Sequence, residues 1–124
     1  MKLTSNTELT RIEAALTALV AATGIIHIGV GLMAEYQVLT LAGAGFIGGA
    51  GLFLAGPKID DIAGFEAGFS RAALSGLVLP YTGYQFIAYY SIYGLMGSPV
   101  AVADKLVQTG VLILASTYLY EELR

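Results

Sequence analysis

Long apolar stretches alternate with short polar ones along the chain, and each apolar stretch is about as long as a membrane-spanning helix. Crossing about 30 Å of hydrocarbon at 1.5 Å per residue takes about 20 residues of α-helix. We therefore predict four spans, over residues of about 12–34, 37–55, 71–95 and 99–121. Gly56-Pro57 is a typical helix stop and Ser98-Pro99 a typical helix start, which supports these limits.

The connections between the spans indicate how the spans are arranged. Short turns at residues 34–37 and 96–98 predict two antiparallel hairpins. In the longer connection, 56–70, Ile62, Phe65 and Phe69 recur at helical spacing, so we predict a short interfacial helix there; the alternative is an ordinary surface loop. The predicted fold is all-α, a single membrane domain over 1–124 that forms an integral membrane four-helix bundle of two antiparallel hairpins.

The positive charges predict the orientation of this bundle. Four spans put both termini on one side, together with the connection 56–70. Five of the six Lys and Arg residues lie on that side and Lys105 lies on the other; the five are Lys2, Arg11, Lys58, Arg71 and Arg124. By the positive-inside rule, we predict that both termini and the connection 56–70 are cytoplasmic.

Composition agrees with lipid as the solvent. Hydrophobic residues make up 56% of the chain and charged residues 12%, whereas soluble domains are about 25% charged. The net charge of −3 leaves no basic patch, so we expect no nucleic-acid partner. The chain has no cysteine, which excludes disulfides and thiol chemistry.

Small residues gather in the first two predicted spans, where they would let helix backbones approach closely. They are Gly24 and Gly31 in the first span and two small-xxx-small pairs in the second, Ala44/Gly48 and Gly45/Gly49. We predict that the first two spans pack face to face through these residues. The alternative is that the glycines line a pore or form a surface for self-association.

Strongly polar side chains also lie well inside the predicted spans, where they are costly and often functional. They are His27, Gln85, Asp104 and Gln108. Helical rise puts His27 about 20 Å and Gln85 about 21 Å from the cytoplasmic boundary, and Asp104 about 9 Å below the outer boundary. These depths predict one polar layer in the outer half of the bundle, in which Asp104 accepts a hydrogen bond from His27. The alternatives are a purely structural contact between helices, or a position of Asp104 at the water interface.

Two further residues carry predictions. Pro80 lies in the middle of the third span and should bend it, because proline removes a backbone hydrogen bond. Glu13 lies one turn inside the first span, where we expect it to interact with lipid headgroups or with Arg71.

No pattern in the chain is typical of an enzyme. There is one His, no Cys and no metal-binding spacing, and the predicted topology brings no Ser, His and acidic residue together. We therefore predict no catalytic residues, no metal site and no cofactor.

The chain as a whole is acidic, rich in Ala, Gly and Val and poor in Lys. In this composition and in its hydropathy it resembles uncharacterised four-helix membrane proteins of halophilic archaea, some of which are similar to the DoxX-like group. The resemblance implies a location in the plasma membrane and no defined activity.

Two functional classes remain. The first is a non-enzymatic accessory or scaffolding subunit that packs against a partner membrane protein or against copies of itself. The second is an oligomer that conducts a proton, an ion or a small solute along the polar layer. The sequence favours the first class, because it contains no continuous polar stripe from one membrane boundary to the other.

Overall fold

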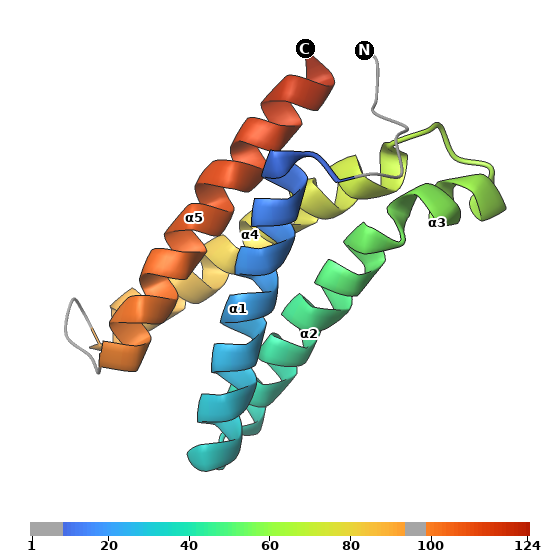
Figure 1. The fold of residues 1–124 in the computed structure, drawn as a ribbon. Helices are drawn as coiled ribbons and strands as arrows, with labels where there is room; N and C mark the ends of the chain where they lie inside the picture. Colours follow the sequence, from blue (N-terminus) through green and yellow to red (C-terminus); the bar gives the residue numbers. More distant parts are fainter. Residues whose placement is uncertain (1–8, 94–98) are drawn as a thin grey trace.

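The computed structural model describes residues 9–93 and 99–124, and this part of the chain folds into helices without any strand. The all-α prediction is thus confirmed. In chain order the helices are α1 (Arg11–Met33), α2 (Gln37–Leu54), α3 (Gly56–Ala63), α4 (Phe69–Tyr93) and α5 (Pro99–Leu123) (Figure 1).

Three helices of the described chain, α1, α2 and α5, are long and apolar enough to cross a membrane. Helix α4 has 25 residues and covers most of the predicted span 71–95, whose last two residues lie outside the described part. Its middle is polar, because Tyr-Thr-Gly-Tyr-Gln occupies residues 81–85. It continues as one helix through Pro80.

The ends of the helices follow local sequence signals. Helix α1 begins with a capping box, in which the Thr10 hydroxyl accepts from the Glu13 N–H and a Glu13 carboxylate oxygen accepts from the Thr10 N–H. Helix α3 lies between the second and third predicted spans, as expected, but it is shorter than the spacing of Ile62, Phe65 and Phe69 suggested. It ends at Gly64, whose φ of 75° gives the left-handed cap that glycine adopts easily.

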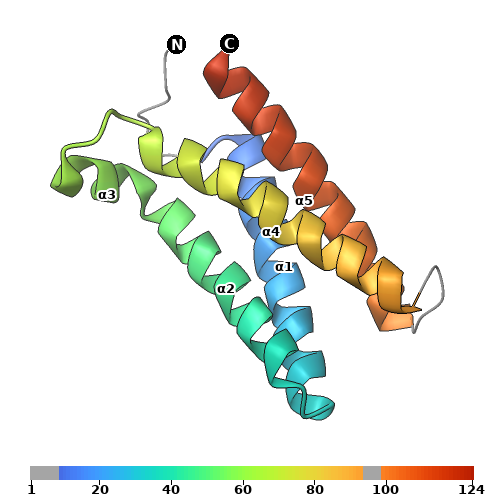
Figure 2. The same ribbon diagram turned by 180° about the vertical axis from the view of Figure 1, so that it is seen from behind.

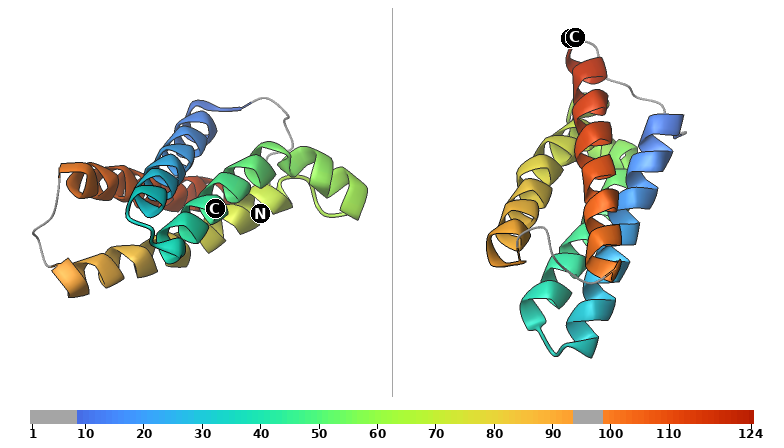
Figure 3. Two further views of the ribbon diagram at one scale, coloured as in Figure 1. Left: turned by 90° about the horizontal axis from the view of Figure 1, so that it is seen from below. Right: turned by 90° about the vertical axis from the view of Figure 1, so that its left-hand side faces the viewer.

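The long helices form two antiparallel pairs, α1 with α2 and α4 with α5 (Figures 1 and 3). The start of α1, the end of α5 and the whole of α3 lie at one end of the molecule (Figure 1). Helix α5 packs against both α1 and α4, and α2 packs along α1. Helices α2 and α4 diverge from each other away from α3 and share few contacts (Figure 2).

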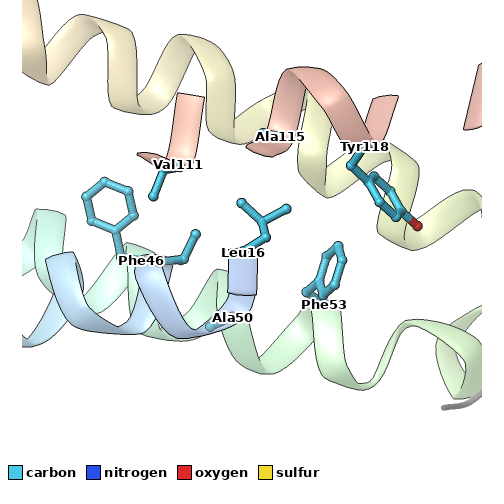
Figure 4. Packing of buried hydrophobic residues seen from close by; sticks show 8 residues of the cluster. Leu16, Phe46, Ala50, Phe53, Val111, Ala115 and Tyr118 are labelled. Carbon is cyan, nitrogen blue, oxygen red and sulfur yellow. The ribbon is translucent and has the colours of Figure 1, made fainter. Parts of the chain in front are cut away.

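The hydrophobic core lies between α5 and the α1–α2 pair (Figure 4). Its buried members are Leu16 and Val20 of α1, Phe46, Ala50 and Phe53 of α2, and Val111, Ala115 and Tyr118 of α5. Partly buried side chains of α4, among them Leu74 and Val78, pack against this cluster.

Helices α1 and α2 approach closely at glycines, as the sequence suggested, but only one face of α2 takes part. A β-carbon added to Gly24 would lie 3.0 Å from the Gly43 carbonyl oxygen, and one added to Gly31 would lie 2.6 Å from the Thr40 backbone nitrogen. The contact on α2 thus runs through Thr40, Gly43 and Ile47.

The two predicted small-xxx-small pairs of α2 lie elsewhere. Ala44 and Gly48 are exposed, and a methyl group on Gly48 or Gly49 would meet no described atom of another helix within 4 Å. Gly45 contacts the Tyr81 hydroxyl of α4 instead of α1. The reason is that Phe46 and Ala50 turn into the core, which fixes the rotation of α2 and directs its other small face away from α1.

Candidate polar site in the helix bundle

The structure brings the four predicted polar residues together from three helices: His27 from α1, Gln85 from α4, and Asp104 and Gln108 from α5. Asp104 is 5% exposed and Gln108 is fully buried. Two residues that the sequence interpretation did not include, Thr23 and Lys105, join them. We call these six residues the Asp104 cluster.

Thr23 is the central hydrogen-bonding group of the Asp104 cluster. Its hydroxyl donates to Asp104 Oδ1 over 2.5 Å and accepts from Gln108 Nε2 over 3.3 Å. Thr23 is one turn before His27 on α1 and is fully buried. A single hydroxyl therefore links α1 to two side chains of α5.

His27 lies beside Asp104 but bonds differently from the prediction. Its Nδ1 lies 2.8 Å from the Thr23 carbonyl oxygen and 3.5 Å from Asp104 Oδ1. We assign Nδ1 as the protonated ring nitrogen and as the donor to the Thr23 carbonyl oxygen. That oxygen can only accept a hydrogen bond, and it lies nearer to Nδ1 than Asp104 Oδ1 does. The hydrogen bond that we expected from His27 to Asp104 thus comes from the Thr23 hydroxyl, while the imidazole stays within ion-pair distance of the carboxylate.

Lys105 and the two glutamines complete the Asp104 cluster. Lys105 Nζ lies 3.6 Å from Asp104 Oδ2 and donates to Gln108 Oε1 over 2.7 Å. Gln108 Nε2 also lies 3.3 Å from Gln85 Oε1 and donates to it, which ties α4 to α5. The Thr23 hydroxyl and the His27 ring therefore lie next to Asp104 Oδ1, and the Lys105 ammonium group lies next to Asp104 Oδ2.

A second buried polar group lies at the opposite end of the α1, α4 and α5 core. Glu13 is fully buried, with Oε2 3.6 Å from Arg71 Nη1, and accepts a hydrogen bond of 3.1 Å from the Tyr118 hydroxyl. Of the two partners expected for Glu13, the structure has Arg71. We call Glu13, Arg71 and Tyr118 the Glu13 cluster; along α1 it is about 20 Å from His27.

Arg71 also binds the end of α2. Its Nε donates to the Phe53 carbonyl over 2.8 Å and its Nη2 to the Leu54 carbonyl over 3.3 Å. The guanidinium lies 5.2 Å from the centre of the Phe53 ring. These carbonyls belong to the last turn of α2, where backbone oxygens lack helical partners, so Arg71 satisfies them while it neutralises Glu13.

One face of α4 carries polar residues from the Glu13 cluster to the Asp104 cluster. Arg71, Ser75, Thr82 and Gln85 follow each other at helical spacing. Ser75 is 1% exposed and Thr82 is fully buried, and neither hydroxyl has a hydrogen-bond partner among the described residues. The sequence interpretation did not connect these four residues into one stripe.

The chemistry available to the Asp104 cluster is proton exchange and the binding of small polar groups. A carboxylate and an imidazole 3.5 Å apart can both gain and lose a proton. Within residues 9–93 and 99–124, no three His, Cys, Asp or Glu side chains lie close enough together to hold a metal ion. Comparison of the chain with protein-family models, with curated proteins and with solved structures found no match.

Proposed function

We propose that the protein spans the plasma membrane four times, with α4 as the span between α3 and α5, and that both termini are cytoplasmic. Three apolar helices support a membrane location. Arg11, Lys58, Arg71 and Arg124 belong to the end of the molecule where α1 starts, and Lys105 belongs to the other end. The positive-inside rule therefore favours this orientation, and the resemblance to proteins of halophilic archaea favours the plasma membrane.

We further propose that the helix bundle conducts protons, with Asp104 as the group that accepts and releases them. The observation that carries this proposal is the burial of Asp104 between three helices, with the His27 imidazole 3.5 Å away. Ionisable groups inside spans are costly and usually serve transport or proton transfer. The buried polar face of α4 supports the same function, because its hydroxyls can hydrogen-bond to transient water molecules between the Asp104 cluster and the Glu13 cluster.

The test is proton flux in reconstituted vesicles. We expect the wild-type protein to dissipate an imposed pH gradient, and Asp104→Asn to slow this about tenfold. Asp61→Asn is the matched control, because Asp61 is exposed on α3 and the substitution removes the same charge. Wild-type vesicles that hold the gradient as well as protein-free vesicles, or equal rates for the two variants, would contradict the proposal.

An accessory or scaffolding subunit remains the second candidate, and one observation favours it. The exposed small face of α2, with Ala44 and Gly48, contacts no helix of the described chain closely and has the spacing of helix-association motifs. For this function we expect a second membrane protein, or a second copy, to copurify in mild detergent. Gly48→Leu should release that partner without changing proton flux, whereas Asp104→Asn should leave it bound.

A further inference from the structure

The Asp104 cluster contains a positive charge of its own, which three groups hold in place. Lys105 Nζ lies 3.6 Å from Asp104 Oδ2 and donates to Gln108 Oε1 over 2.7 Å. It also lies over the Phe86 ring of α4, 5.7 Å from the ring centre, where the negative face of the ring attracts a cation. A Lys side chain is long and flexible. These contacts therefore fix the ammonium group beside the carboxylate.

The oxygen atoms of the Asp104 cluster are of the kind that binds metal cations such as sodium and potassium. Nearly all of them are already engaged: Asp104 Oδ1 accepts from the Thr23 hydroxyl, Gln108 Oε1 accepts from Lys105, and Gln85 Oε1 accepts from Gln108. The remaining carboxylate oxygen, Asp104 Oδ2, lies beside the ammonium group. The ammonium group therefore takes the position that a metal cation would take between Asp104 Oδ2 and Gln108 Oε1.

The charges of the Asp104 cluster cancel in this arrangement. Among the described residues, only His27 of α1 and Lys105 of α5 are charged or titratable groups within ion-pair distance of Asp104, and α4 contributes the uncharged amide of Gln85. With the imidazole neutral, one negative charge faces one positive charge. The Lys105 side chain is only 15% exposed, so its charge is weakly screened and repels a second cation at short range.

A proton differs from a metal cation in what it needs from the Asp104 cluster. A metal cation needs several oxygen ligands at once, and these are engaged. A proton needs one lone pair, which either the Asp104 carboxylate or the neutral His27 imidazole supplies. The arrangement around Lys105 thus blocks the binding of a metal cation and still permits protonation.

We propose that Lys105 excludes metal cations from the Asp104 cluster, which makes the cluster selective for protons. Without the ammonium group, the buried carboxylate has no compensating charge. Sodium then competes with protons for Asp104 and for the freed Gln108 oxygen. The effect on flux rests on the proposed conduction of protons through Asp104, whereas the exclusion of metal cations does not and is measured separately.

The first test measures sodium binding by thermal unfolding in mild detergent at alkaline pH, where protons compete least. The reference salt is the chloride of N-methylglucamine, a bulky organic cation, at equal ionic strength. We expect the wild type to melt at the same temperature in both salts. In Lys105→Met, sodium at about ten times its dissociation constant should raise the melting temperature by about 4 °C.

Three further variants control this measurement. Lys58→Met is the matched control, because Lys58 is exposed on α3 and the substitution removes the same charge; it should respond to sodium like the wild type. Asp104→Asn combined with Lys105→Met should abolish the response, because the carboxylate is gone. Lys105→Gln is a second neutral variant that keeps a donor for Gln108, and it replaces Lys105→Met if that variant does not fold.

The second test measures proton flux in vesicles that contain either sodium or N-methylglucamine. We expect equal rates in the two salts for the wild type and for Lys105→Arg, which keeps the positive charge. In Lys105→Met, sodium at about ten times its dissociation constant should slow proton flux about tenfold.

Two results would overturn the proposal. The first is a sodium response of the wild-type melting temperature as large as that of Lys105→Met. The second is the absence of any sodium response in both neutral variants. A wild-type protein that conducts no protons, while Lys105→Met alone is stabilised by sodium, would contradict proton conduction and support the exclusion of metal cations by Lys105.

Discussion

The ion pair between Glu13 and Arg71 gives the sharpest prediction about stability. Arg71→Met keeps an unbranched side chain of similar length but removes the guanidinium. Glu13 then stays fully buried without its positive partner, and the Phe53 and Leu54 carbonyls lose their donor. Breaking a buried pair in this way costs about 3–5 kcal/mol. That is well above the average of about 0.6 kcal/mol for hydrogen bonds between helices in membranes.

A double-mutant cycle isolates the charge interaction. Glu13→Gln removes the charge and keeps the capping box, because glutamine also serves in that position. We expect Arg71→Met to cost about 1–3 kcal/mol less in the Glu13→Gln background than in the wild type. The assay is reversible unfolding in mild detergent, followed by circular dichroism. Additive effects of the two substitutions would refute the inference that these charges depend on each other.

Three further predictions concern single residues. Thr23→Val should lower the free energy of unfolding by about 1–3 kcal/mol, because Asp104 and Gln108 lose the hydroxyl that both of them contact. Thr23→Ser keeps that hydroxyl and should have a much smaller effect. Both variants are measured by unfolding in detergent. Gly43→Ala should destabilise the α1–α2 contact, because the new β-carbon would lie 2.6 Å from the Gly24 carbonyl oxygen. Gly48→Ala should be tolerated. Equal melting temperatures of these two variants would contradict this prediction. Thr82→Val should raise stability by about 1 kcal/mol by removing an unpartnered buried hydroxyl, yet slow proton flux in vesicles; unchanged flux would remove Thr82 from the proton path.

The helices could be predicted well from apolar run length and from helix stop signals. The predicted limits of the first two spans, 12–34 and 37–55, differ by at most one residue from those of α1 and α2. Residues 56–70 were harder, because apolar spacing continued past the true end of α3. Gly64 ends that helix through its positive φ, a conformational effect that hydrophobic periodicity does not detect.

The rotation of α2 could not be predicted, because small residues surround most of that helix. Gly43, Gly45 and Gly48 all satisfy the rule that small residues allow close packing. Only the burial of Phe46 and Ala50 on the core side selects Gly43 for the contact with α1. That selection depends on packing against α5, which is distant in the sequence.

The polar site could be predicted in part. Depth arithmetic placed His27, Gln85 and Asp104 at one level, and the structure has them in one cluster. Thr23 was missed because threonines inside helices commonly bond to the carbonyl four residues earlier, as Thr17 does to Glu13. The tertiary contact with Asp104 gives the Thr23 hydroxyl a different partner, and the spacing to His27 was the available signal.

Proton conduction through the bundle requires that buried Asp104 exchanges protons with the aqueous phase. Difference infrared spectroscopy of the protein in bilayers, recorded while the bulk pH is stepped, measures this directly. If Asp104 exchanges protons, the spectra contain a carbonyl band of a protonated carboxyl group that appears and disappears with pH, is absent in Asp104→Asn and remains in Asp61→Asn. Identical difference spectra for wild type and Asp104→Asn would contradict it, because Asp104 would then keep one protonation state throughout.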